Sequence, residues 1–255
     1  MLILLPPSET KRLGGTHAPL DLERLALPTL TPQRRGAVNA LVELSGDAVA
    51  AARVLGLSSR QLGEIEVNAA LRTSPTMAAI DRYTGVLYDA LAADSLEPAA
   101  RRWLGSHAMI HSAPFGPVGA LDRIPAYRLG AGASIPSLGP LRRHWASAVT
   151  AALEVSGASF VLDLRSEAYV ALGPVPSTIA SIYLRVVTAS EGGAVRALNH
   201  FNKHAKGALT RLLATGRPRI RSVAGFARWA NSAGVDVRPR EGGTWELVEG
   251  KVGIT

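Results

Sequence analysis

The sequence predicts a single α/β domain with a mixed α+β character, in which helices surround a mixed sheet. Two short apolar runs, Leu2–Leu5 and Phe160–Leu164, have the length of buried strands, and segments with helical periodicity lie between them. The 255 residues are 47% apolar and 19% charged, which is typical of globular chains. Because no internal repeat or low-complexity linker divides the chain, we expect residues 1–255 to fold as one domain.

The first half of the chain begins with a strand and continues with helices. Pro6-Pro7 end the strand over residues 2–5. Residues 31–53 have helical spacing with Thr31 as the N-cap, and Ser58 is expected to cap a second helix. The turn between them predicts a helix-hairpin-helix-like element within residues 31–70. The other elements expected in this half are helices over 77–92 and 97–104, a strand over 108–110, and an ordered Gly- and Pro-rich loop over 116–139.

The second half is expected to add four strands and three helices. Residues 160–164 and 181–187 are the strand candidates, and residues 196–201 are expected to pair with the latter across a turn at Glu191-Gly192-Gly193. The helices are expected over 140–154, 203–214 and 222–233, and an edge strand over 245–248.

Positive charge is concentrated in the second half of the chain. The net charge is +8; residues 1–127 hold 12 basic and 12 acidic residues, whereas residues 128–255 hold 16 and 8. Such a field raises the local concentration of anions and predicts an anionic ligand or partner. The alternative is a general use of arginine for solubility. No acidic residue lies between Glu191 and Asp236, a stretch that carries Arg196, Lys203, Lys206, Arg211, Arg217, Arg219, Arg221 and Arg228.

Several classes of protein are excluded by composition. The chain has no cysteine, so it has neither disulfides nor thiolate-bound zinc. The N-terminal apolar run is too short for a signal peptide, and no segment is long enough to span a membrane. We therefore expect a cytoplasmic protein without a membrane partner.

Polar side chains follow the first predicted strand. Ser8, Thr10 and Lys11 could hold a phosphate or carboxylate, and Glu9 could act as a base. Ligand sites in α/β sheets lie at the carboxyl ends of strands, where loops present polar groups above a rigid scaffold. The alternative is an exposed polar turn.

A similar arrangement follows the strand over 160–164, with Asp163, Arg165 and Ser166. Asp163 alternates with Val161 and is expected to point inward, where it needs a cationic partner. Arg128 and Lys203 are the candidates. The alternative is that Asp163 caps the following turn.

Two further segments carry groups that can bind anions. In the segment 200–207, Asn202, Lys203 and Lys206 form a polar cluster, and two lysines one helical turn apart suit a phosphate. In the segment 124–129, Tyr127 offers a stacking face beside Arg128, which can bind a carboxylate or phosphate through two parallel hydrogen bonds. The alternatives are a solvated helix face and a structural ion pair.

No motif indicates a metal or a cofactor. His107 and His111 are four residues apart, but the segment between them is an expected strand, and His200 and His204 have no acidic neighbours. The sequence also has no P-loop, dinucleotide fingerprint or nucleophile elbow, so no cofactor is named.

Taken together, these segments resemble the YaaA family, bacterial proteins of the peroxide stress response. The likeness runs from the first residue to about residue 235 and depends on six motifs in the same order. These are MLILLPPSETKR at 1–12, YTGVLY at 83–88, SAPFG at 112–116, IPAYRL at 124–129, VLDLRSEAY at 161–169 and HFNKHAKG at 200–207.

The resemblance implies an α/β fold with a helix-hairpin-helix and a positively charged cleft. It also implies binding of nucleic acid and protection of DNA from peroxide damage when iron is in excess. The region around Leu55–Arg60, which would correspond to the hairpin, has no basic cluster. Pro114 and Gly119-Ala120 depart from the family pattern, which points to a specialised paralogue.

Two functions therefore remain open, and whether the chain is an enzyme is not decided by the sequence. The first is binding of duplex DNA, for which a spread of lysine and arginine is sufficient. The second is an enzyme that acts on a small anionic substrate such as a nucleotide, because the motifs mix hydroxyl, acidic and basic groups. The second requires Lys11, Arg128, Asp163 and Lys203 to meet in one pocket.

Overall fold

The computed structural model describes residues 1–187 and 195–248, except for the side chains of residues 195–200. The strands are β1 (Leu2–Leu5), β2 (Met77–Ala78), β3 (Ala108–Ser112), β4 (Gly116–Gly119), β5 (Arg123–Ile124), β6 (Ser134–Ile135), β7 (Gly139–Pro140), β8 (Phe160–Asp163), β9 (Ala180–Val187), β10 (Val237–Pro239) and β11 (Thr244–Val248). The α-helices are α1 (Thr31–Leu44), α2 (Ala48–Leu55), α3 (Gly63–Ala69), α4 (Ala79–Arg82), α5 (Val86–Leu91), α6 (Pro98–His107), α7 (Leu141–Glu154), α8 (Glu167–Val170), α9 (Val195–Gly216) and α10 (Val223–Ser232).

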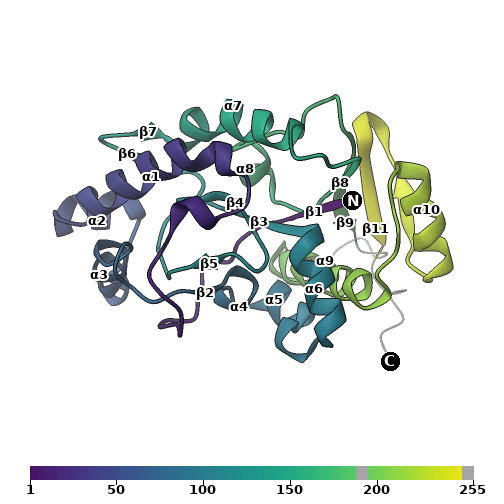
Figure 1. Cartoon of the computed structure of the whole chain (residues 1–255), viewed down its shortest axis with the longest axis horizontal. Helices are drawn as coiled ribbons and strands as arrows, with labels where there is room; N and C mark the ends of the chain where they lie inside the picture. Colours follow the sequence, from purple (N-terminus) through teal and green to yellow (C-terminus); the bar gives the residue numbers. More distant parts are fainter. Residues whose placement is uncertain (188–194, 249–255) are drawn as a thin grey trace.

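A mixed seven-stranded sheet forms the centre of this α/β fold. Its strand order is β10-β11-β9-β8-β1-β3-β4, in which β11, β9, β8, β1 and β3 are parallel and the two edge strands are antiparallel to their neighbours. Helices α1 and α7 lie on one side of the sheet, and α5, α6 and α9 lie on the other (Figure 1). The fold class predicted from the sequence is thus confirmed.

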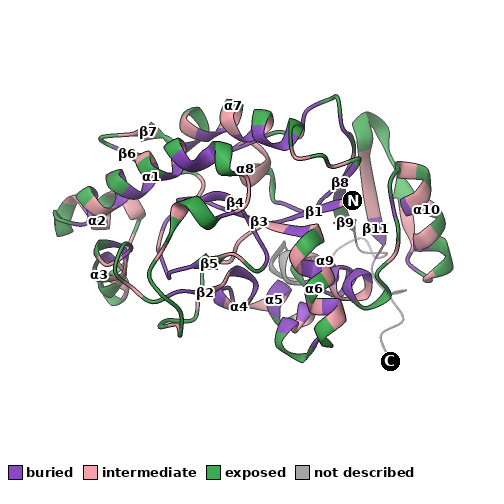
Figure 2. Cartoon of the chain, viewed as in Figure 1, coloured by how far each residue is buried: buried purple, intermediate pink, exposed green. Residues whose placement is uncertain are grey.

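The central strands are apolar because both faces of the sheet are covered. All four residues of β1 are buried, and Phe160, Val161 and Leu162 of β8 have no exposed surface. Figure 2 shows buried residues along the central strands and exposed residues on the outer faces of the helices. Burial of each such side chain contributes about 1.5–3 kcal/mol, so these two strands anchor the core.

The strand order creates a topological switch point beside β1, where consecutive parts of the chain continue to opposite sides of this strand. From β1 the chain continues to β3 and β4 on one side, and later returns to β8 on the other side of β1. The segments that follow β1 and β8 therefore diverge at the carboxyl ends of the strands. In open α/β sheets, ligands bind in the crevice at such a position.

The helix expected over 31–53 is two helices, α1 and α2. Asp47 ends the continuity, because its carboxylate accepts hydrogen bonds from the backbone N–H groups of Val49 and Ala50 and caps α2. Thr31 is the first residue of α1 and not its N-cap, which is Leu30. Ser58 caps only the short 3-10 helix Ser59–Gln61, where it forms a capping box with Gln61; the N-cap of α3 is Leu62, so the expected cap of the second helix is wrong. A DNA-binding role for this pair of short helices stays a prediction.

The helix expected over 77–92 is also interrupted. Tyr83 is extended, and Tyr83 and Thr84 lie beside the loop that follows β1, where the Thr84 backbone N–H donates to the Thr10 carbonyl at 3.2 Å. Gly85 has φ +93°, a conformation that favours glycine, and it separates α4 from α5. This break results from a contact between segments that are 74 residues apart.

Three expectations for the rest of the chain need correction. The loop over 116–139 contains the short strands β4, β5 and β6. Residues 196–201 belong to α9 and not to a strand, because no glycine or proline interrupts the chain from 194 to 206; the turn expected at 191–193 lies outside the described residues. Finally, β11 is not an edge strand, because β10, which contains Pro239, pairs with its outer side.

Candidate functional site

The loop that follows β1 lies against the segment between α4 and α5. Besides the Thr84 contact, the Arg12 backbone N–H donates to the Arg82 carbonyl at 2.9 Å, and Lys11 forms a β-bridge with Tyr83. Arg82 itself is fully buried, and its guanidinium donates to the backbone carbonyls of Arg12, Pro75 and Ile124. The loop is therefore held in one position by the backbone.

Three hydroxyl groups meet where these two segments touch. The Oγ1 atom of Thr84 donates to Oγ1 of Thr10 at 2.9 Å, and Oγ of Ser8 lies 3.3 Å from the same atom. A Cβ atom added at Gly85 would lie 3.5 Å from Ser8 Oγ and 3.6 Å from Thr10 Oγ1, so the glycine borders this cluster. The hydroxyls can donate to an anion as well as to one another.

The amine of Lys11 is enclosed by aromatic rings and backbone. Its Nζ lies 4.1 Å from the centre of the Tyr127 ring and 5.6 Å from that of Tyr83, and it donates to the carbonyls of Ser8 and Glu9 at 3.0 and 3.2 Å. Among the described residues no carboxylate forms an ion pair with it. Burial, followed by the neighbouring Arg128 guanidinium, lowers the pKa of Lys11 to about 7.

Arg128 supplies a second cation at the same place. Its guanidinium lies 3.4 Å from a carboxylate oxygen of Glu9, and the side chain of Arg128 is 18% exposed whereas that of Glu9 is 84% exposed. Buried Asn68 fixes the backbone of Arg128 from both sides, since it accepts from the Arg128 N–H and donates to the Arg128 carbonyl, each at 2.8 Å. The arginine is thus held by the protein, while its ionic partner is exposed to solvent.

A cluster of tyrosines lies beneath these cations. The hydroxyls of Tyr83 and Tyr127 are 2.8 Å apart, and the hydroxyl of Tyr88 donates to the Pro6 carbonyl at 2.7 Å. Burial raises the pKa of all three phenols well above the usual value, so they remain neutral hydrogen-bonding groups.

The carboxylate of Asp163, at the end of β8, is paired with Arg165. The Arg165 guanidinium donates to both Asp163 oxygens, at 2.9 and 2.6 Å, and neither side chain is more than 4% exposed. The partners expected from the sequence, Arg128 and Lys203, were wrong, because an arginine two residues away can reach around the end of the strand.

Arg165 also contacts the neighbouring strand. Its third guanidinium nitrogen lies 2.8 Å from Nδ1 of His111 in β3 and donates to the Gly173 carbonyl at 2.9 Å. Each guanidinium nitrogen therefore has a protein partner, so Arg165 has a structural role in this conformation and is not placed to bind an anion. Burial, followed by the Arg165 charge, lowers the pKa of His111 well below its usual value, which keeps the imidazole neutral.

The residues predicted on α9 divide into a buried and an exposed group. Lys206 is buried, and within the described part of the chain its amine has no hydrogen bond or ion pair; its backbone carbonyl accepts from the Thr210 hydroxyl at 2.8 Å. Burial lowers its pKa to about 8, and the charge of Asp163 acts in the opposite direction. Lys203 is exposed, Asn202 is half-buried, and exposed Ser166 precedes α8 without capping it through its side chain.

Two groups of predicted residues are therefore formed, and Tyr169 lies between them. The first contains Ser8, Glu9, Thr10, Lys11, Tyr127 and Arg128; the second contains Asp163, Arg165 and Lys206. Burial, then Tyr127 and Glu9, raise the pKa of Tyr169, while Arg128 lowers it, and the Tyr169 carbonyl lies 3.4 Å from the Arg165 guanidinium. Nothing in the described contacts brings Lys203 to either group.

Several residues of the site were not predicted from the sequence. Tyr83 and Thr84 belong to the YTGVLY motif but were assigned to a helix. Asn68 holds the backbone of Arg128, which is 60 residues away, and His111 contacts Arg165, which is 54 residues away. The local sequence gives no signal for such distant contacts.

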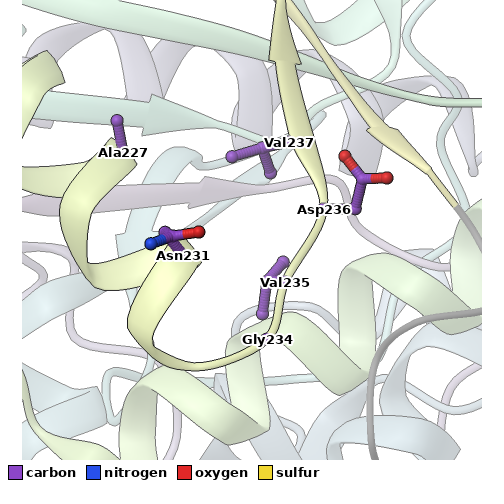
Figure 3. Close-up of a pocket in the computed structure, with 6 residues that line it drawn as sticks. All are labelled: Ala227, Asn231, Gly234, Val235, Asp236 and Val237. Carbon is purple, nitrogen blue, oxygen red and sulfur yellow. The ribbon is translucent and has the colours of Figure 1, made fainter.

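The described residues offer few other candidate sites. In that part of the chain, no three His, Asp or Glu side chains gather to hold a metal ion, and no helix is long and apolar enough to cross a membrane. A cavity of about 300 Å³ lies between α10 and β10 (Figure 3). None of its six lining residues belongs to the groups above; they are Ala227, Asn231, Gly234, Val235, Asp236 and Val237.

Comparison with known proteins gives the chain a family. The family described as Peroxide stress protein YaaA matches residues 1–238. The chain is 45% identical to a UPF0246 protein of Corynebacterium efficiens, over 95% of this chain and 96% of that protein. It is 41% identical to a UPF0246 protein of Corynebacterium glutamicum, over 97% and 100% of the two chains, and 44% identical to one of Streptomyces coelicolor, over 85% and 84%. The chain therefore belongs to the family of the peroxide stress protein YaaA.

Proposed function

We propose that this YaaA family member binds a small anionic ligand, such as a phosphate or nucleotide, in the crevice at the carboxyl ends of β1 and β8. The observation that carries the proposal is the surplus of cations there. Lys206 is buried and Lys11 is half-buried, neither forms an ion pair with a carboxylate among the described residues, and the ionic partner of Arg128 is the exposed Glu9. A buried charge without a partner is costly, so the site is completed by an anion.

The kinds of residue around these cations support a small ligand. The hydroxyls of Ser8, Thr10 and Thr84 provide directional donors next to Lys11, as expected where a few polar groups fix the orientation of a ligand. The rigid backbone of duplex DNA, in contrast, binds to exposed basic side chains. If the site is catalytic, Glu9 is the better candidate for proton transfer, since Arg165 occupies both oxygens of Asp163.

Isothermal titration of the full chain with inorganic phosphate and a nucleoside monophosphate tests the proposal. Arg128→Ala is expected to weaken binding by about tenfold, because a charge-assisted contact is lost. Arg142→Ala is the matched control, since Arg142 is an exposed arginine of α7 with no ion pair among the described residues. Equal affinity in both variants and the wild type, or no binding to the wild type, would refute the site.

Binding of nucleic acid is the second candidate, and a different surface favours it. Arg217, Arg219 and Arg221 are exposed in the segment between α9 and α10, and Arg228 is exposed on α10; none of them forms an ion pair among the described residues. Such side chains suit the phosphates of DNA. Together with the peroxide stress family, they support a role in protecting DNA from peroxide and iron. Around the α2–α3 turn, only Arg53 and Arg60 are basic, so this element would contribute less.

A further inference from the structure

The chain uses lysine sparingly, and its placement is informative. Of the 28 basic residues 24 are arginine, and the four lysines are Lys11, Lys203, Lys206 and Lys251. Arginine remains charged in proteins, whereas lysine can lose its proton when it is desolvated. A lysine kept at a half-buried position in an arginine-rich chain therefore indicates a need for the amine itself.

The surroundings of Lys11 fit this need. Two hydrogens of its Nζ are directed to the carbonyls of Ser8 and Glu9, which leaves one position on the nitrogen for a third hydrogen or a lone pair. The Tyr127 ring covers one side at 4.1 Å and Tyr83 lies farther away at 5.6 Å, so water has limited access. The position lies directly after β1, at the switch point of the sheet.

The charges that face Lys11 are opposed. Arg128 and Arg82 favour the free amine, as does burial, which is the largest influence. Glu9 of the same loop and Glu64 of α3 favour the ammonium, as do the electron-rich face of Tyr127 and the two carbonyls. Their balance gives a pKa of about 7, at which about half of the amine is unprotonated in neutral solution.

We propose that Lys11 is a nucleophile for the carbonyl carbon of a small anionic substrate, such as a 2-oxo acid or an aldehyde that carries an acidic group. This inference rests on the proposed anion site, in which Arg128 would hold the acidic group. Lysines made reactive by desolvation and by a neighbouring cation are known to form imines with carbonyl compounds.

The covalent step is balanced without an oxidant or a reductant. The Nζ lone pair forms a bond to the carbonyl carbon while the electrons of the C=O π bond move to oxygen. A proton passes from nitrogen to that oxygen to give a carbinolamine, and loss of water then gives the imine. Cyanoborohydride can trap the imine, because its hydride adds to the C=N carbon and leaves a stable secondary amine.

The test uses the wild-type full chain with cyanoborohydride at pH 7 and either acetaldehyde or glyoxylate. Peptide fragmentation gives the labelling rate at each lysine and separates Lys11 from the Met1 amine. Lys203, which is exposed, serves as the internal control. We expect Lys11 to be labelled roughly tenfold faster than Lys203 or more, since an ordinary lysine is almost entirely protonated at pH 7.

The two aldehydes separate the reactive amine from the anion site. Both should label Lys11, with a preference for glyoxylate over acetaldehyde that Arg128→Ala abolishes. Because Arg128 also favours the free amine, labelling by acetaldehyde should persist in this variant at a lower rate. If Lys11 reacts no faster than Lys203 with either aldehyde, the nucleophile is refuted whether or not phosphate binds. If Lys11 reacts quickly but without preference for glyoxylate, the anionic substrate and the proposed anion site are refuted together.

Discussion

The amine of Lys11 lies 4.1 Å from the centre of the Tyr127 ring, and its hydrogen bonds go to backbone carbonyls and to no carboxylate. The surroundings of Lys11 stabilise its protonated form only partly, because burial and the charge of Arg128 both act against protonation of the amine. A residue that costs stability is retained where it has a function. The following predictions test this view and its alternatives.

Lys11→Met should stabilise the chain at neutral pH. The pKa of Lys11 is about 7 in the folded chain and 10.5 for an ordinary lysine, so between these values the unfolded chain binds more protons. The free energy of unfolding of the wild type therefore rises with pH from 7 to 10.5, and the cost of burial is fully present below pH 7. Urea denaturation should show a gain of about 1 kcal/mol or more for Lys11→Met at pH 7.

The free energy of unfolding of Lys11→Met should rise less steeply with pH than that of the wild type. Some rise will remain, because the pKa of Lys206, about 8, is lowered in the same direction. Lys203→Met, at an exposed position, should change neither quantity. A loss of stability at pH 7 with an unchanged pH dependence would contradict the account.

Asp163→Asn should destabilise the chain strongly. The substitution leaves Arg165 buried without its counter-ion, and breaking a buried pair from one side costs about 3–5 kcal/mol. Glu23→Gln breaks the exposed pair with Arg35, where a change within about 0.5 kcal/mol is expected. The urea midpoints of the two variants are compared. A loss of less than about 1 kcal/mol in the free energy of unfolding for Asp163→Asn would show that the ion pair with Arg165 does not stabilise the carboxyl end of β8.

Gly207→Ala should disturb the packing of α9 on α5. A Cβ atom there would lie 2.0 Å from the Leu87 carbonyl oxygen, which is backbone and cannot move aside. We expect a loss of about 2 kcal/mol or more in thermal or urea unfolding, despite the better helix propensity of alanine. Gly216→Ala at the end of the same helix meets only Pro218, at 4.0 Å, and should be neutral or stabilising. Similar stability of the two variants would argue against this close contact.

Charge reversal of Arg217, Arg219 and Arg221 to glutamate separates the two candidate functions. If duplex DNA binds at this surface, fluorescence anisotropy should show affinity that is lost in the triple variant and that falls steeply with salt in the wild type. Glu9→Gln, in the crevice, should leave DNA affinity unchanged. Equal DNA affinity of the triple variant and the wild type would remove this surface from consideration.

The parts of the fold that depend on local sequence could be predicted, and those that depend on distant contacts could not. Strand β1 and strand β8 were found because buried parallel strands are continuous apolar runs. The break at Tyr83–Gly85 was missed because its cause is the loop that carries Lys11, far away in the chain. Residues 196–201 were assigned to a strand because a short apolar pattern fits either structure.

The candidate site shows the same division. Position after a strand was enough to select Ser8, Glu9, Thr10 and Lys11, because such positions meet at one edge of a parallel sheet. The partner of Asp163 could not be chosen, since the geometry at the end of β8 decides between a neighbouring arginine and a distant one. Lys203 and Lys206 looked alike in sequence, but packing of α9 buries only Lys206.

The most direct test of the central claim is a crystal structure of the full chain grown with phosphate or a nucleotide. The account predicts an anion in the crevice at the carboxyl ends of β1 and β8, in contact with Lys11 or Arg128. An anion bound only at the surface around Arg217, Arg219 and Arg221, with none in the crevice at saturating concentration, would contradict it.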